Sequence, residues 1–176
     1  METLALNLTK YREDDPFDFL YREHATPLFR YAYALTGSTQ DAEDIAAEVL
    51  GKAFARWRHS TPARPGGYLR QMVTNVVIDR HRRNRRWTTR LPLVATKEHV
   101  ASHTDRVDEQ TVVIDALQHL LPRQRAAIVL RYWQGASDAQ IAEEIGVALG
   151  SVGSLIHRGL ATLRLELNEE QNNGAF

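Results

Sequence analysis

The sequence predicts an all-α protein made of two small helical domains joined by a flexible linker. Apolar residues recur at steps of three, four and seven along most of the 176 residues, the spacing of helices that bury one face. Ser, Thr, Pro and Gly interrupt this pattern where helices would begin or end. The pattern fades between residues 88 and 108. We therefore place the domains at residues 10–87 and 109–168, with the linker at 88–108.

Three helices are predicted in the first domain. The first covers about residues 17–35 and stops at a Thr-Gly-Ser sequence. The second covers residues 39–57, and acidic residues occupy its first turn, where the helix dipole favours them. After a loop rich in Pro and Gly, the third helix begins at about Gly67. Its apolar face is predicted to be buried while four arginines point outward: Arg70, Arg80, Arg82 and Arg83.

The second domain is predicted to end in a helix-turn-helix. Two helices come first, one with a core face of Val112, Val113, Ala116, Leu117, Leu120 and Leu121, and one running from Pro122 to about Trp133, in which residues 126–133 continue that core. Residues 137–147 then form a short capped helix that closes on Gly146, and residues 151–165 form a longer helix. In DNA-binding proteins the second helix of such a pair enters the major groove. An antiparallel helical hairpin with another purpose shows the same pattern, so this motif alone is only moderately specific.

Charge is unevenly distributed, although the formal net charge is zero. Residues 52–90 hold eleven Lys or Arg and a single acid, Asp79, whereas the segments on both sides are acidic. A dense cationic run attracts a polyanion, because each neutralised phosphate releases condensed counterions. Nucleic acid is therefore the partner that we expect for this segment.

Composition excludes several classes of function. The chain has no cysteine, which excludes disulfides, thiolate nucleophiles and Cys-based zinc fingers. No apolar run approaches the ~18 to 20 residues of a membrane span, and the N-terminus lacks the features of a signal peptide, so we expect a cytoplasmic protein without membrane insertion. No catalytic or phosphate-binding motif is present, so we expect no enzyme and no cofactor. His99 and His103 could share a metal ion if helical, but no motif fixes a third ligand, and we expect no metal site.

Short motifs run through both domains in a fixed order. In the first domain they are Phe29-Arg30-Tyr31-Ala32, Asp41 to Val49 running on to Trp57, Tyr68-Leu69, Asn75, Asp79 and Arg82-Arg83. In the second they are Leu120 to Arg125, Arg131-Tyr132, Ile141-Ala142, Gly146, Gly150-Ser151-Val152, His157-Arg158 and Leu163-Arg164. In this order and spacing, over about residues 17–165, they resemble the extracytoplasmic-function (ECF) sigma factors of the sigma-70 family. These are small promoter-specificity subunits of bacterial RNA polymerase.

The resemblance implies a region 2 helical bundle followed by a region 4 helix-turn-helix. It also implies a non-enzymatic subunit that binds core RNA polymerase and directs promoter-specific initiation of transcription. In that role the protein would recognise the −35 element as duplex and the −10 element as a melted strand. Its partners would be core polymerase and promoter DNA, with an anti-sigma factor as a further candidate.

Residue roles follow from the resemblance for three surfaces. Polymerase binding would fall on the acidic second helix, through Asp41, Asp44 and Glu48. The −10 strand would be held by the loop at 58–65 and the basic helix after it, through Arg64, Tyr68, Asn75, Arg80, Arg82 and Arg83, because unpaired bases need stacking and phosphate contacts. The −35 duplex would be contacted by Ser151, Ser154, Leu155, His157, Arg158 and Arg164.

Departures from the family leave alternatives open. Ala47 stands where the family often has Gln, and Gly153 and Leu155 stand where its recognition helix usually has basic residues. Without Arg-to-guanine contacts, recognition of the −35 element would be weaker or more dependent on DNA shape. Trp57 and Tyr68 fit the role of core anchors equally well. A stand-alone helix-turn-helix regulator, or a sigma-like adaptor without promoter activity, remain as alternative functions.

Overall fold

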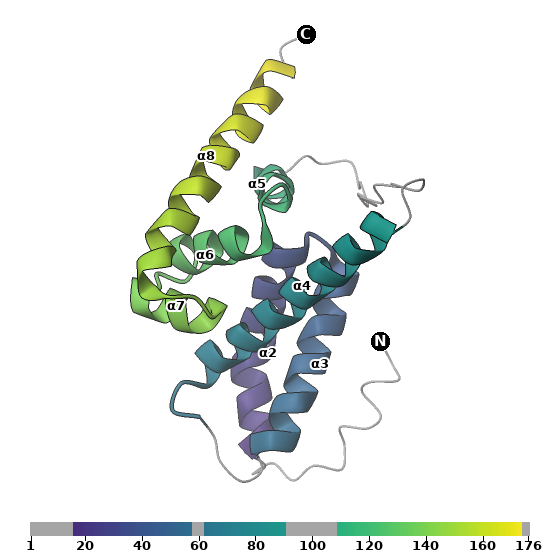
Figure 1. The fold of residues 1–176 in the computed structure, drawn as a ribbon. Coiled ribbons are helices and arrows are strands. Elements are labelled where there is room, and N and C mark those ends of the chain that lie inside the picture. Colours follow the sequence, from purple (N-terminus) through teal and green to yellow (C-terminus); the bar gives the residue numbers. More distant parts are fainter. Residues whose placement is uncertain (1–15, 58–61, 91–108, 174–176) are drawn as a thin grey trace.

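The computed structural model describes residues 16–57, 62–90 and 109–173, and within these ranges the chain forms seven helices and no strand (Figure 1). In order they are α2 (Pro16–Thr36), α3 (Thr39–Trp57), α4 (Pro65–Arg90), α5 (Glu109–Gln118), α6 (Pro122–Tyr132), α7 (Asp138–Ile145) and α8 (Leu149–Asn173). The all-α prediction is confirmed. Most of the predicted linker, residues 91–108, lies outside the described residues, as does the start of the first predicted domain, residues 10–15.

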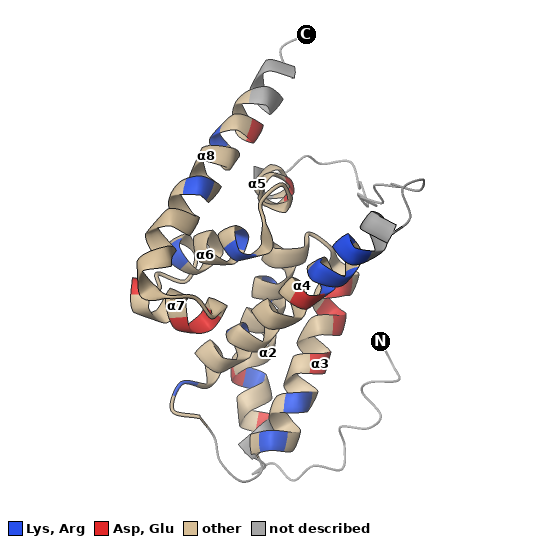
Figure 2. Cartoon of the chain, in the orientation of Figure 1, with Lys and Arg blue, Asp and Glu red and all other residues tan. Residues whose placement is uncertain are grey.

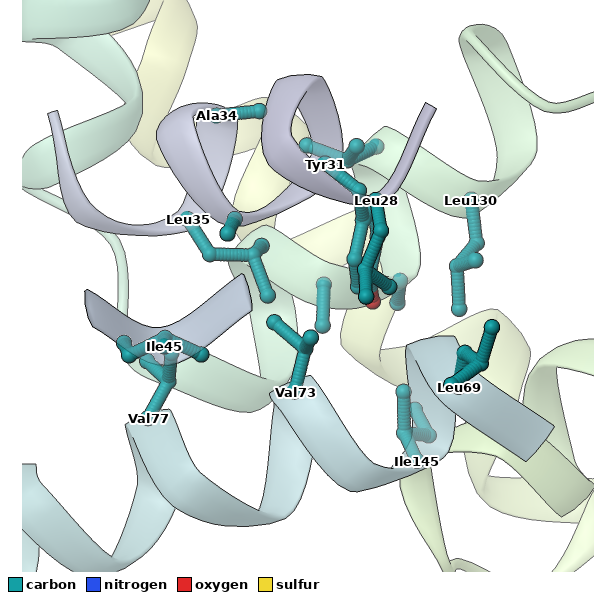
Figure 3. Close-up of a cluster of buried hydrophobic side chains, with 14 of the residues drawn as sticks. Leu28, Tyr31, Ala34, Leu35, Ile45, Leu69, Val73, Val77, Leu130 and Ile145 are labelled. Atoms are coloured by element: carbon teal, nitrogen blue, oxygen red, sulfur yellow. The ribbon is translucent and has the colours of Figure 1, made fainter. Parts of the chain in front are cut away.

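Helices α2, α3 and α4 form a bundle in which every helix packs on the other two. The turn between α2 and α3 is made at Gly37, whose φ of 68° suits glycine and whose N–H donates to the carbonyl oxygen of Tyr33 at 2.8 Å. Leu35, Ile45 and Val73 are completely or almost completely buried between these helices (Figure 3). Burial of such side chains stabilises the bundle by about 1.5 to 3 kcal/mol each.

A buried polar contact fixes α4 against α2. The hydroxyl of Thr74 donates to the carbonyl oxygen of Arg70 at 2.9 Å and lies 2.8 Å from the hydroxyl of Tyr31. Since the single proton of Thr74 is used in the first bond, Tyr31 donates in the second. Burial raises the pKa of Tyr31 far above its ordinary value, so its phenol stays protonated and keeps this hydrogen bond.

Helices α5 to α8 form the second part, which ends in the predicted helix-turn-helix. Ser137 caps α7 by accepting from the backbone N–H of Gln140, and the turn to α8 is made at Gly146 with a φ of 65°. Ile141 and Val152, one from each helix of the motif, are both fully buried. The predicted geometry of the motif is therefore confirmed.

The two predicted domains pack against each other rather than standing apart. Helix α4 contacts α6 and α7, and α2 contacts α5 and α6. Leu69 of α4, Leu130 of α6 and Ile145 of α7 belong to the same hydrophobic cluster as the buried residues of α2 and α3 (Figure 3). The described chain thus has one apolar core that continues from the first part into the second.

Arg125 in α6 reinforces this packing. It is only 8% exposed, and its guanidinium donates to the carbonyl oxygens of Leu35, Gln118 and Leu120 and to the side-chain oxygen of Gln118. Leu35 lies in the last turn of α2, where helix carbonyls lack a partner within the helix. Burial lowers the pKa of Arg125 to about 10, which leaves it protonated at neutral pH.

Some predicted faces were wrong in detail. Arg70 points into the interface with α7 instead of outward, while Val113, Leu121 and Trp133, predicted in the core, are between 43% and 54% exposed. Helix α8 also continues eight residues beyond the predicted end at residue 165.

Among the described helices, none alone is long and apolar enough to cross a membrane. The bent pair of Asp138–Ile145 with Leu149–Asn168 meets the test for a membrane span by length and composition only.

Candidate nucleic-acid interface

The acidic face of α3 lies beside the basic half of α4. Asp41, Asp44 and Glu48 are all exposed and follow each other at helical spacing. The Oδ1 atom of Asp41 accepts from Arg80 at 2.9 Å. One predicted polymerase-binding residue is therefore paired with one predicted −10 residue in this structure, and the two predicted surfaces adjoin.

Glu48 is held in its charged form by cations around it. The ammonium group of Lys52, four residues later, lies 2.5 Å from its carboxylate, and this hydrogen bond is the largest cause that lowers the pKa of Glu48. Arg80 and Arg83 lower it further through their charge. Asp44, between these two paired acids, is exposed and forms no ion pair with the described residues.

Exposed cations gather over the second half of α4 (Figure 2). The side chain of Arg82 is 59% exposed and lies 3.9 Å from Asp79, a distance at which a surface pair holds it weakly. Arg83 and Asn75 are exposed as well. This part of α4 can therefore meet a polyanion without first breaking strong contacts.

Arg64 and Tyr68, at the start of α4, lie in a different environment. Tyr68 is half-buried, and its ring centroid is 5.8 Å from that of Trp57. A hollow of about 180 Å³ is lined by Arg64 and Tyr68 together with Gly67, Gln71, Glu143 and Glu144. We call it the Tyr68 hollow. Residues 58–61 of the predicted −10 loop lie outside the described residues. The ring contact supports an anchoring role for Trp57 and Tyr68, and Tyr68 also lines the hollow.

A bidentate ion pair joins α4 to α7, and its carboxylate partner Glu144 also lines the Tyr68 hollow. The Nε and Nη2 atoms of Arg70 donate to the two carboxylate oxygens of Glu144 at 2.8 and 2.7 Å. The Glu144 side chain is only 3% exposed and that of Arg70 22%. The hydrogen bond to Glu144 is the main reason why the pKa of Arg70 is raised. The sequence analysis missed this pair, although Glu144 stands in the buried stripe between Ile141 and Ile145.

The predicted −35 residues lie on the first five turns of α8. Ser154, His157, Arg158 and Arg164 are exposed, whereas Ser151 and Leu155 are half-buried. The hydroxyl of Ser154 donates to the carbonyl oxygen of Ser151 at 2.9 Å, and Nε of Arg158 donates to that of Ser154 at 3.2 Å. These bonds hold Arg158 along its own helix.

The recognition helix and the basic half of α4 share a second hollow of about 270 Å³, which we call the Leu155 hollow. Leu155 and Arg158 of α8 line it from one side, and Arg82 and Arg85 of α4 from the other. Leu155 also packs against the core, so this side of α8 faces α4 instead of being fully open.

In the described parts of the chain no group of three His, Asp or Glu residues could hold a metal ion. The two histidines considered in the sequence, His99 and His103, lie outside the described residues.

Comparison with known proteins matches both halves of the chain. The family description "Sigma-70 region 2" matches residues 20–87, and "Sigma-70, region 4" matches residues 110–163. The chain is 37% identical over 163 residues to the ECF RNA polymerase sigma factor SigL of Mycobacterium tuberculosis, covering 85% of this chain and 88% of the relative. It is 32% identical over 157 residues to the RNA polymerase sigma-E factor of Streptomyces coelicolor, covering 86% and 85%. The chain belongs to the ECF sigma factors.

A solved structure supports the fold of this sigma factor. The sigma factor RpoE of Bartonella quintana, solved in complex with the anti-sigma factor NepR, superposes with a TM-score of 0.69 at 24% identity. The match covers 86% of this chain and 96% of that one. At this identity the likeness concerns the fold alone.

Membership of the family decides the general function. Sigma factors bind core RNA polymerase and direct transcription initiation at promoters, and this chain carries both of the regions that its relatives use. The family consists of transcription factors rather than catalysts. The stand-alone helix-turn-helix regulator is not favoured, because region 2 matches over 68 residues ahead of the helix-turn-helix.

Proposed function

We propose that this sigma factor divides its work among three surfaces on α3, α4 and α8. The acidic face of α3, with Asp41, Asp44 and Glu48, docks on core polymerase. The start and basic half of α4 hold the melted −10 strand, and the exposed side of α8 contacts the −35 duplex. The protein does this in the cytoplasm, without catalysis and without a cofactor.

One observation carries this proposal. A run of exposed cations on α4 stands directly beside an acidic, exposed face of α3, so that DNA and polymerase would bind adjacent sides of one rigid bundle (Figure 2). A strand held on α4 by phosphate contacts would thus lie next to the enzyme that must copy it. Opening the duplex costs free energy, and binding the unpaired strand in preference to the duplex supplies part of it.

Recognition of the −35 element is proposed to depend mainly on position and shape. Arg158 and Arg164 are the exposed cations of α8 up to residue 165, and both suit phosphate contacts that position the domain. Gly153 leaves open space on α8, since no atom lies within 4 Å of a Cβ placed there. Duplex can therefore approach the backbone closely at this point, while the readout by Arg or Lys at positions 153 and 155 is missing.

An anti-sigma factor is proposed as a further partner. The Bartonella quintana neighbour was solved with one, and the fold is shared with this chain. This part of the proposal is tested by co-purification of the chain with candidate proteins from its own organism.

Run-off transcription tests the proposed function. Bacterial core polymerase is combined with fragmented genomic DNA, with and without the protein, and new transcripts are mapped. Discrete new start sites support the proposal and reveal the promoter elements. Stable polymerase binding without transcription would indicate the adaptor, and absence of polymerase binding would indicate a DNA-binding regulator.

A matched pair of variants tests the polymerase surface. Asp44→Asn removes an exposed charge from the proposed face, and we expect about three- to tenfold weaker binding to core polymerase, the scale of one useful interface contact. Glu23→Gln removes an exposed charge from α2 and serves as the control. Equal affinities for the two variants would remove Asp44 from the surface.

A further inference from the structure

The recognition helix begins with an exposed apolar side chain. Leu149 is the first residue of α8 and is 58% exposed. Along residues 138–160, all of which the structure describes, it is the one large apolar side chain that is exposed. The other large apolar residues of this stretch are buried or pack against the core, among them Ile141, Val152 and Ile156. The two helices of the motif therefore hold together without Leu149, whose side chain is accessible to a partner.

The helix surface around Leu149 carries no bulky or charged side chain. Gly150 is adjacent to Leu149, and Gly153 lies one turn later on the same side of the helix. A Cβ placed at either glycine would meet no atom within 4 Å beyond the helix backbone and the adjacent residues. Arg158 is the first charged residue of α8. A partner can therefore approach the backbone of the first two turns closely, and Leu149 is the large side chain that it would meet there.

The position of Leu149 suits contact with base edges in the major groove. The chain bends by 90° between α7 and α8, as expected for a helix-turn-helix (Figure 1). In such motifs the residues at the N-terminal end of the second helix contact the base edges. Leu155, which the sequence analysis assigned to the −35 duplex, is half-buried and packs against the core. Leu149 is thus the apolar residue in the first turns of α8 that can reach the groove.

Thymine offers an apolar partner in the major groove. Its C5-methyl group lies there, whereas the edges of a G·C pair present hydrogen-bonding groups. A leucine placed against the acceptors of guanine or the amino group of cytosine would remove water from them without supplying a hydrogen bond. Against a thymine methyl group, the same side chain buries apolar surface on both partners. The chemistry of Leu149 therefore favours a T·A pair.

We propose that Leu149 is a specificity-determining residue that contacts the methyl group of a thymine in the −35 element, with Gly150 and Gly153 allowing α8 to come close enough for this contact. The inference rests on the proposed function, because that function assigns the −35 duplex to α8. It adds one direct base contact to a recognition that otherwise depends on position and shape.

Deoxyuridine tests this contact, because it lacks the methyl group of thymidine and keeps the same base pair. Run-off transcription first defines the −35 element, and each of its thymines is then replaced in turn in a promoter duplex. Competition binding to the complex of the protein with core polymerase measures the affinity of each duplex. At one position we expect deoxyuridine to weaken binding about fourfold, the effect of one buried methyl group.

The variant Leu149→Ala shows whether Leu149 makes the contact. It should bind the thymine duplex about fourfold or more weakly, and it should no longer distinguish thymine from deoxyuridine at that position. Leu165→Ala is the matched control, since Leu165 is 65% exposed further along the same helix, and it should keep the full methyl effect. A methyl effect that survives in Leu149→Ala, or a −35 element in which no thymine methyl group matters, would overturn the inference.

Gly153→Met tests the close approach separately from folding. Methionine favours a helix more than glycine does, and the space at Gly153 is open, so urea unfolding should show equal or higher stability. The added side chain should hold α8 away from the groove, so the methyl effect should fall from about fourfold to less than about twofold. An unchanged methyl effect would overturn the role of this glycine.

The two proposals can fail separately. If the protein starts transcription at discrete sites with core polymerase, the proposed function stands, and the deoxyuridine test decides on Leu149 alone. If it directs no transcription, the proposed function fails, and duplexes that the protein alone selects from a random library replace the promoter in the same test. Failure to select any duplex would overturn the inference as well.

Discussion

The double variant Arg82→Ala with Arg83→Ala tests whether the basic half of α4 holds DNA phosphates. Both side chains are exposed, and the single acid near Arg82, Asp79, is 3.9 Å away. A surface pair of this kind contributes less than about 1 kcal/mol to folding. The double variant should therefore fold normally, and its effect should appear in DNA binding.

The expected magnitude follows from counterion release. Each phosphate contact on a single strand contributes about 0.7 to the slope of log K against log salt, so two lost contacts flatten the slope by about 1.4. Between about 50 and 200 mM salt the unmodified protein should lose about sevenfold more affinity than the variant does. At low salt the variant should bind more weakly and open-complex formation should be reduced.

Fluorescence anisotropy of a labelled −10 strand, titrated with the protein bound to core polymerase, measures this slope. The control is Arg22→Ala with Arg30→Ala, which removes two exposed cations from α2 and should leave the slope unchanged. An unchanged slope for the Arg82 and Arg83 variant would refute their assignment as phosphate contacts.

Three further predictions concern stability. Gly159→Ala places a Cβ 2.6 Å from Cδ1 of Ile128 and should destabilise the fold by about 1 to 3 kcal/mol in urea unfolding, whereas Gly153→Ala meets open space in the same helix and should stabilise it by up to about 1 kcal/mol. Arg125→Met leaves buried carbonyl oxygens without donors and should lower the free energy of unfolding by about 3 kcal/mol, an effect that chemical denaturation at neutral pH would detect. Burial, and then the charges of two arginines, lower the pKa of His81 below 6.5, so the folded chain binds fewer protons than the unfolded chain there. Stability should therefore fall as the pH drops below 6.5, and His81→Gln should show a smaller fall.

Much of the fold could be predicted because helical periodicity and capping are local signals. The helix-turn-helix is the clearest case: Ser137 caps α7, Gly146 makes the turn, and Ile141 is buried, all as the spacing predicted. Faces at the ends of helices were harder to assign. Val113 and Leu121 fit the apolar pattern of α5 and its following turn, yet both are exposed, whereas the neighbouring Ile114 and Leu117 are buried.

Contacts between distant parts of the chain could not be predicted, because they depend on how two helical surfaces meet. Arg70 was expected to face solvent as part of a cationic run, and nothing within α4 distinguishes it from Arg80. Only the position of Glu144 in a buried stripe indicates that an acid must find a partner there, since a buried carboxylate is costly when unpaired. The partner lies 74 residues away and is fixed by tertiary packing alone.

The neutral total charge of the sequence has a structural counterpart, because acids outside the basic segment pair with its arginines. Asp41 binds Arg80, Glu143 approaches Arg64, and these two pairs are exposed enough for salt to screen them. The pair of Arg70 with Glu144 is different, since burial protects it from screening, and the apolar contacts around it do not depend on salt. A change of ionic strength would thus weaken the two exposed pairs without separating α4 from α7. Separating α4 from α7 therefore requires a partner that binds the separated state more tightly than the packed one, because a ligand shifts such an equilibrium only by the difference between its affinities for the two states.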